Sequence, residues 1–117
     1  MDIEAAVDQF AESVALQHAA IWGDADFEKS NHFARKAHES FEHLRGYGDD
    51  GRNSLMRLLF DQRIPVRIAA AVYLLRHCTA QATAVLKKEA AGSGILAFEA
   101  EQALERWKDG SWSLDLP

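Results

Sequence analysis

The side chains best suited to chemistry lie between residues 28 and 43, where carboxylates and histidines recur four residues apart. These acid–histidine pairs are Glu28–His32, His38–Glu42 and Glu39–His43. A spacing of four brings the two members of each pair onto one face of a helix. A zinc or di-metal centre needs such ligands to converge on one point, so their directions decide whether a metal can bind.

The directions of His38 and His43 argue against a metal centre. They are five residues apart, so they point about 140° apart around a helix, and residues 38–43 are not a His-Glu-x-x-His zinc helix. A carboxylate-bridged di-metal bundle would need a Glu-x-x-His motif from each of two helices, and no second helix supplies one. We therefore expect a solvated, salt-bridged face with no metal and no cofactor. A metal-binding helical protein that uses these His and Glu residues remains an alternative.

Nucleophilic catalysis finds no support in the sequence. No Ser, Cys or Lys has a recognisable activating context. The segment Gly92-Ser93-Gly94 is too short for a phosphate-binding loop and follows no strand. Cys78 is the single cysteine, which excludes an internal disulfide and a Cys-based metal site, and we expect its thiol to be buried and inert. The prediction is a protein that is not an enzyme and has no catalytic residues.

Charge and hydropathy narrow the choice of partner. The chain has 117 residues and a formal net charge of -5, which disfavours nucleic-acid binding and permits a basic protein partner. No apolar run approaches the roughly 20 residues that a membrane span requires. The segment Met1-Asp2-Ile3-Glu4 is acidic where a signal peptide would be basic. We expect a soluble cytoplasmic protein that binds neither nucleic acid nor membrane.

Five residues are candidate contacts for a protein partner. They are Trp22, Asn31, Arg35, His38 and Arg52. Trp22 ends its helix beside a glycine, so we expect it to be the most exposed of the three tryptophans. Asn31, Arg35 and His38 belong to the polar helix that also carries the acid–histidine pairs. Arg52 begins a helix, where a cation is unfavourable, so it either pairs with Asp49 or faces a partner.

Apolar residues at helical spacing, with start and stop signals between them, predict six helices and no strand. The first covers residues 3–22, the second runs from Asp24 or Asp26 to about Leu44, and the third starts at Asp49 or Asp50 and includes Leu59. The fourth runs from Pro65 to about His77, the fifth from Thr79 to about Ala90, and the sixth carries Leu96 to Trp107 and ends at Gly110. The expected N-caps are Asp2, Asp24 or Asp26, Asp49 or Asp50, and Thr79, whereas Pro65 opens the fourth helix. The inward stripe of the second helix is expected to comprise Phe27, Ser30, Ala34, Ala37, Phe41 and Leu44. The tail is expected to pack back through Trp112.

Short connections favour three antiparallel hairpins at about 3–46, 51–78 and 79–109, followed by a tail at 110–117. Residues 55–77 and 85–107 share an order of short apolar helix, break and longer apolar helix, which is a weak repeat with an offset of about 30 residues. Each hairpin alone would leave an apolar face open, so neighbouring hairpins should stack. We expect one domain over residues 1–117.

Residues 58–75 resemble the core of a HEAT repeat. The matching positions are Leu58-Leu59, Asp61, Pro65-Val66-Arg67, Ala70-Ala71 and Leu74-Leu75. Residues 79–109 lack the Pro and the Val-Arg. Residues 14–112 are similar to a small bacterial family of HEAT-like proteins catalogued as a domain of unknown function. The features that carry this second likeness are Trp22 with Asp24, Asn31, Leu44-Arg45-Gly46, Gly51-Arg52, Leu58-Leu59, Val66-Arg67 and Ala70-Ala71.

The resemblance implies an all-α fold of the right-handed HEAT or armadillo solenoid type. In that pattern Asp61 and Arg67 stabilise the turn between helices. The function we expect is a non-enzymatic protein-binding module, either an adaptor or, in its sharper form, an immunity or antitoxin-like protein with a basic partner. We expect a monomer or a weak homo-oligomer. The alternative of another class is a HEAT-like nucleic-acid-processing enzyme.

Overall fold

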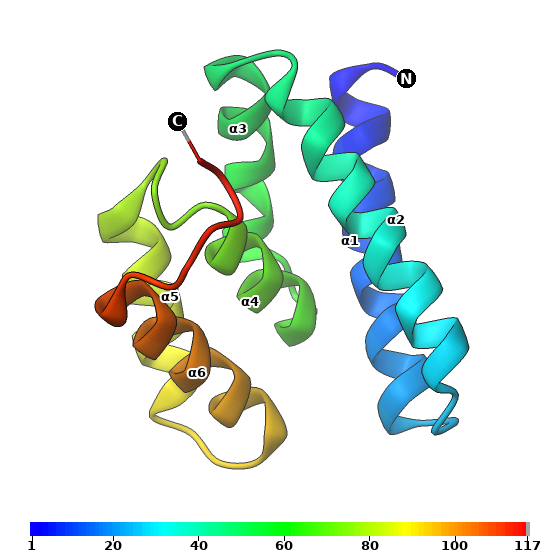
Figure 1. Ribbon diagram of the computed structural model, residues 1–117, viewed down its shortest axis with the longest axis vertical. Coiled ribbons are helices and arrows are strands. Elements are labelled where there is room, and N and C mark those ends of the chain that lie inside the picture. Colours follow the sequence, from blue (N-terminus) through cyan, green and yellow to red (C-terminus); the bar gives the residue numbers. More distant parts are fainter. Residues whose placement is uncertain (117) are drawn as a thin grey trace. The chain divides into compact units, whose positions relative to one another are not determined.

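A computed structural model of the chain describes residues 1–116, in which six α-helices and one short 3-10 helix account for all the regular structure (Figure 1). The helices are α1 (Ile3–Trp22), α2 (Phe27–Arg45), α3 (Asp49–Leu55), η1 (Met56–Phe60), α4 (Ile64–Tyr73), α5 (Thr79–Ala90) and α6 (Ile95–Asp109). No strand occurs in the described residues, so the all-α prediction is confirmed. None of these helices combines the length and the apolar character needed to cross a bilayer.

The chain divides into two units, Met1–Arg57 and Leu58–Pro117, and the structure describes the second up to residue 116. In the first unit α1 and α2 pack along their lengths, around the fully buried rings of Phe10 and Phe41. The predicted caps at both helix starts are present. The carboxylate of Asp2 accepts a bond of 2.7 Å from the Ala5 N–H, and that of Asp26 accepts one of 3.0 Å from the Lys29 N–H.

The expectation that Phe27 faces inward is wrong, because 67% of its surface is exposed. The buried face of α2 is set by Ser30, Ala37, Phe41 and Leu44. At 100° per residue Phe27 lies about 80° from Ala37 around the helix, so it falls at the edge of that face. It also stands in the first turn of α2, directly after the connection from α1.

The start of α3 also differs from the prediction. Its N-cap is Gly48, with a φ of 65°, and neither Asp49 nor Asp50 caps it, because both lie within its first turn. Glycine adopts this left-handed conformation at little cost, so it can turn the chain where aspartate would be strained. The leucines Leu55, Leu58 and Leu59 are buried as expected, although a 3-10 helix from Met56 takes over from α3.

In the second unit α4 packs on α5 and α6, which pack on each other. Pro65 stands in the first turn of α4 as predicted, but the helix ends at Tyr73 and not near His77. Residues of the tail bond to the chain near that end. The indole N–H of Trp112 donates a 2.8 Å bond to the Val72 carbonyl, and the Arg76 guanidinium bonds to Asp115. The predicted packing of the tail through Trp112 is confirmed.

Thr79 does not cap α5. Its hydroxyl donates back to the Leu75 carbonyl at 2.6 Å, and the N-cap position belongs to Cys78, whose side chain makes no capping bond. A threonine inside a helix end bonds to the carbonyl four residues earlier when that carbonyl is within reach. Gly110, with a φ of 84°, ends α6 in the left-handed conformation.

Candidate functional site

The exposed side of α2 unites three of the five sequence-predicted contact residues. Asn31, Arg35 and His38 follow each other at spacings of four and three, which places them on one helix face, and all three are exposed. Phe27 lies four residues before Asn31 and extends this face to the start of the helix. Near its other end the His38 ring nitrogen Nε2 lies 3.6 Å from a carboxylate oxygen of Glu42, four residues further along the helix.

The turn between α1 and α2 carries two exposed aromatic rings. Trp22 is the last residue of α1 and is 53% exposed, as the sequence predicted, and Phe27 is the first residue of α2. The Trp22 ring lies 6.1 Å from the His18 ring, centroid to centroid. Rings that are this exposed at one turn gain little from the core, so their position favours an external contact.

The same turn is acidic and tightly built. Between the two rings Asp24 lies 3.9 Å from Lys29, and the Asp26 N–H bonds to the Ala20 carbonyl at 2.8 Å. Ala25 has a φ of 53°, an unfavourable conformation for a residue with a Cβ. Such strain persists only where the surrounding bonds hold it. We define the α1–α2 tip as Trp22, Asp24, Phe27 and Glu28.

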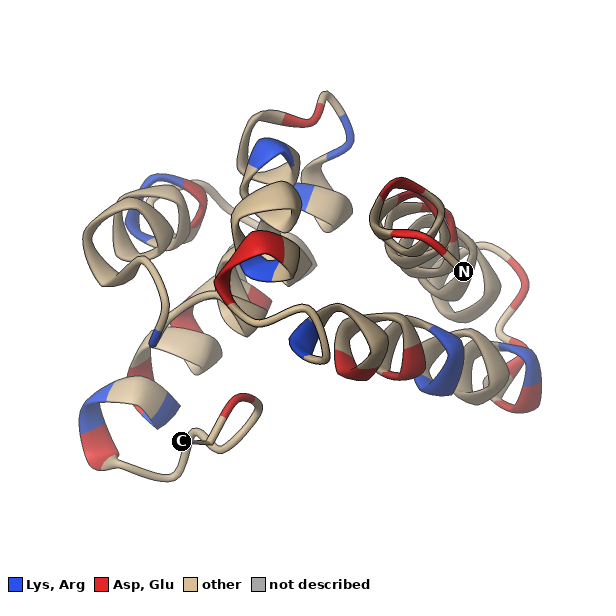
Figure 2. Ribbon diagram, turned by 90° about the horizontal axis from the view of Figure 1, so that it is seen from above, with Lys and Arg blue, Asp and Glu red and all other residues tan. Residues whose placement is uncertain are grey.

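Charge is distributed unevenly along the chain. Residues 1–57 contain 11 Asp and Glu and six Lys and Arg, whereas residues 58–117 contain seven of each kind. The formal net charge of -5 therefore resides in the first unit, where acidic ribbon segments mark the start of α1 and the α1–α2 turn (Figure 2). A basic partner would be attracted to the first unit and not to the second.

Arg52 stands apart from the other candidates. Its guanidinium lies 3.7 Å from the Asp49 carboxylate, and only 14% of its side chain is exposed. Of the two roles that the sequence left open, the structure supplies the ion pair. Arg52 belongs to α3, which follows the C-terminal end of α2, whereas Trp22 and Phe27 lie at the N-terminal end of that helix. The structure therefore does not bring Arg52 to the α1–α2 tip.

Asp61 and Arg67 organise the connection into α4. The Asp61 carboxylate accepts a 2.9 Å bond from the Arg63 N–H at the helix start and a 3.0 Å bond from the Arg63 side chain. The hydrogen bonds from Arg63 lower the pKa of Asp61 below its usual value. Arg67 donates to the Asp61 carbonyl at 2.9 Å and to the Glu89 carboxylate of α5 at 2.8 Å. These bonds join the turn before α4 to the start of α4 and to α5.

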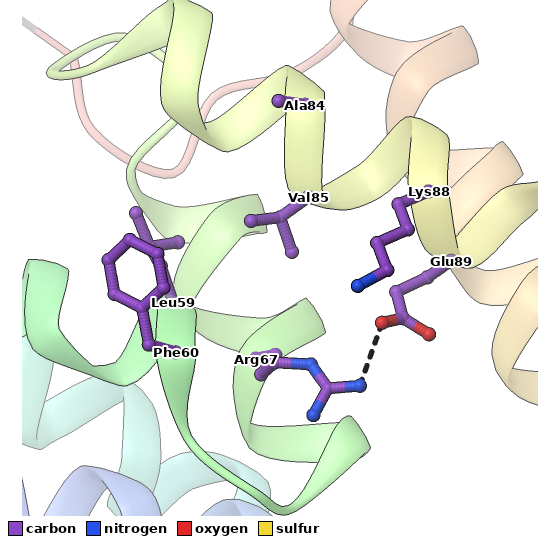
Figure 3. Close-up of a pocket in the computed structure, with 7 residues that line it drawn as sticks. All are labelled: Leu59, Phe60, Arg67, Ala84, Val85, Lys88 and Glu89. Atoms are coloured by element: carbon purple, nitrogen blue, oxygen red, sulfur yellow. Dashed lines mark hydrogen bonds and ion pairs between the residues drawn. The ribbon is translucent and has the colours of Figure 1, made fainter.

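A groove in the second unit was not anticipated from the sequence. It lies between η1, α4 and α5, has a volume of about 420 Å³, and is lined by Leu59, Phe60, Arg67, Ala84, Val85, Lys88 and Glu89 (Figure 3). Phe60 is 81% exposed, more than any other large hydrophobic side chain in the described residues. One signal was available in Leu58-Leu59-Phe60, because three consecutive apolar residues on a helical segment cannot all face the core.

Metal-binding side chains and the single thiol can be placed in the described residues. In residues 1–116 no three His, Cys, Asp or Glu side chains gather where they could hold a metal ion. Cys78 is buried, and burial raises the pKa of its thiol. A thiol with a raised pKa forms little of the reactive thiolate at neutral pH.

The α1–α2 tip, the exposed face of α2 and the groove beside Phe60 are thus three surfaces with exposed side chains that could contact a partner. Comparison of the chain with protein-family models, with curated protein sequences and with solved structures finds no match.

Proposed function

We propose that the chain is a non-enzymatic protein-binding module that contacts a basic partner through the α1–α2 tip. The observation that carries the proposal is the exposure of Trp22 and Phe27 on either side of one acidic turn. Exposed aromatic residues are the side chains that most often anchor protein interfaces. Asn31, Arg35 and His38 extend the same surface along α2 and add polar contacts around the two rings.

The chemistry of the tip suits lysine and arginine side chains. Their cations are attracted to the faces of tryptophan and phenylalanine rings, and the aliphatic stem covers the ring. Asp24 and Glu28 supply carboxylates beside the rings, and the net negative charge of residues 1–57 would speed the approach of a basic protein. An immunity or antitoxin-like protein that neutralises a basic toxin is the sharper form of this proposal.

The HEAT-like solenoid belongs to the same proposal. Its support is the bonding of Asp61 and Arg67, two of the residues that carry the resemblance. Asp61 accepts a bond from the Arg63 N–H at the start of α4, and Arg67 donates to the Asp61 carbonyl and to Glu89 of α5. A helical solenoid presents extended surfaces for binding and needs no catalytic residues. We place its action in the cytoplasm, where a free buried thiol such as that of Cys78 stays reduced.

The test is affinity capture from a lysate of the organism that encodes the chain, at moderate salt. The bait proteins are the wild type, the double variant Trp22→Ala/Phe27→Ala, and Phe98→Ala as a matched control. Phe98 is 55% exposed on α6 of the second unit, so its removal deletes an exposed ring outside the tip. We expect a basic protein that the wild type and the control retain and the double variant loses.

Calorimetry with that purified partner then measures each ring separately. We expect Trp22→Ala to weaken binding by about tenfold or more, as truncation of an aromatic anchor does. The double variant Asp24→Asn/Glu28→Gln should also weaken binding, and its effect should be larger at low salt than at high salt. A captured protein that binds the double variant as tightly as the wild type would overturn the proposal, and so would the capture of no specific protein.

A further inference from the structure

The groove in the second unit has a chemical character opposite to that of the α1–α2 tip. One end is apolar, with Leu59, Phe60, Ala84 and Val85 around it, and the other end carries Arg67, Lys88 and Glu89 (Figure 3). Val85 points into the groove from α5, and Phe60 lies across from it on η1. A volume of about 420 Å³ lies within the range of natural ligand pockets and exceeds the space that one leucine side chain fills.

The charges at the polar end leave one cation uncommitted. Arg67 and Glu89 neutralise each other at 2.8 Å, and Arg67 also donates to the loop carbonyls of Asp61 and Gln62. Lys88 is exposed and forms no ion pair within the described part of the chain. The groove therefore offers an apolar floor beside the positive charge of Lys88, on a unit whose formal charges sum to zero.

We propose that this groove binds an acidic, apolar peptide segment of a protein partner. A leucine or phenylalanine side chain of that segment would lie against Phe60 and Val85, and a neighbouring aspartate or glutamate would pair with Lys88. The charge of Lys88 selects this occupant over a basic segment, because a cation placed beside Lys88 would be repelled. A peptide segment also fits the open form of the groove between two helical elements.

This site goes beyond the function proposed above and stands independently of it. Its residues lie on η1, α4 and α5, its preferred charge is the reverse, and none of its residues belongs to the α1–α2 tip. The chain would accordingly have two binding surfaces of opposite electrostatic preference. Variants of one surface leave the other unchanged, so the failure of either proposal would be visible separately.

The experiment is an NMR titration of the isotope-labelled full chain with two synthetic peptides of one helical design. In the first a leucine and a phenylalanine share one face with two glutamates, and in the second lysines replace the glutamates. We expect the glutamate peptide to bind saturably and to perturb Phe60, Val85 and Lys88 most strongly. We expect the lysine peptide to bind at least about tenfold more weakly, which corresponds to about 1.4 kcal/mol.

Variants of the chain locate the contact. Lys88→Glu should weaken binding of the glutamate peptide by about fivefold or more, because it replaces an attraction with a repulsion. Lys87→Glu is the matched control, since Lys87 is the exposed neighbour on α5 and does not line the groove, and it should change binding by less than about twofold. Phe60→Ser should weaken binding by about tenfold without loss of fold, because the ring is 81% exposed.

Three results would overturn the inference. The first is the absence of saturable binding of the glutamate peptide up to about 1 mM, the weakest affinity worth calling specific. The second is equal affinity for the glutamate and lysine peptides. The third is a perturbation that maps to the first unit and survives Phe60→Ser.

Discussion

A Cβ atom placed on Gly51 would lie 2.0 Å from the carbonyl oxygen of Leu44, far inside van der Waals contact. Gly51 is in α3 and Leu44 is in the last turn of α2, so the absence of a side chain at Gly51 lets α3 rest directly on the backbone of α2. This approach accompanies the burial of Leu55 in the core of the first unit, and only 14% of the Arg52 side chain stays exposed.

Gly51→Ala is expected to destabilise the protein by about 1–3 kcal/mol, because the backbone of α2 must move to admit the methyl group. Alanine is the better helix former, so helix propensity alone predicts the opposite sign. Urea unfolding followed by far-UV circular dichroism measures the difference. Gly46→Ala is the control, since its Cβ would meet only the His43 carbonyl, at 3.2 Å, and Gly46 has ordinary helical φ. Equal stability of Gly51→Ala and the wild type would contradict the close approach.

The Asp61–Arg63 contact predicts a dependence of stability on pH. Hydrogen bonds from Arg63 lower the pKa of Asp61 from its ordinary value of 3.8, so the folded state holds this carboxylate ionised more tightly than the unfolded state does. The contribution is fully present above pH 3.8 and disappears as the pH falls through the lower pKa of the folded state.

Asp61→Asn should therefore lower the free energy of unfolding by about 1 kcal/mol at neutral pH. The gap between the variant and the wild type should close as the pH falls below 3.8 and through the lower pKa of Asp61 in the folded state. Urea titrations at a series of pH values measure this gap. Asp109→Asn is a suitable comparison, because Asp109 lies on the surface at the end of α6, where loss of its bond to Ser111 should matter less. A gap that stays constant with pH would show that ionised Asp61 is not what stabilises the turn.

Trp112→Phe tests whether the tail holds the end of α4. The change keeps an aromatic ring against Trp107, whose centroid lies 5.2 Å away, and deletes the N–H that donates to the Val72 carbonyl. We expect a loss of about 1 kcal/mol in the free energy of unfolding, as for one part-buried hydrogen bond. Trp22→Phe is the matched control, because the indole of Trp22 makes no hydrogen bond in the described residues. The Trp22→Phe variant should be as stable as the wild type. If the Trp112→Phe protein were as stable as that control, the bond to the Val72 carbonyl would not stabilise the end of α4.

The sequence predicts the features of this fold that depend on neighbours a few residues away. Asp2 and Asp26 are caps because aspartate bonds to N–H groups two or three residues ahead, and Pro65 lies in the first turn of α4 because its φ suits that turn. The early end of α4 escaped prediction because Trp112, far along the chain, bonds to its last turn. A contact between residues about 40 positions apart cannot be read from the spacing of neighbouring residues.

Among the candidate sites too, features set by nearby residues follow from the sequence, whereas those that depend on distant contacts do not. The exposure of Trp22 followed from its place at a helix end, and the shared face of Asn31, Arg35 and His38 follows from helical spacing. Phe27 was assigned to the core because apolar spacing alone does not tell the centre of a buried face from its edge. The groove beside Phe60 needs α5 to lie against η1 and α4, and no local pattern shows that pairing.

The buried Cys78 provides a probe of local opening in the second unit. Since the chain contains one cysteine, every reaction with a disulfide reagent reports on a single position, between the end of α4 and the start of α5. Its burial and its raised pKa make the closed protein slow to react, so the observed rate measures how often the second unit opens locally. The reaction rate of this thiol thus reports the rate of local opening in the unit that carries the groove.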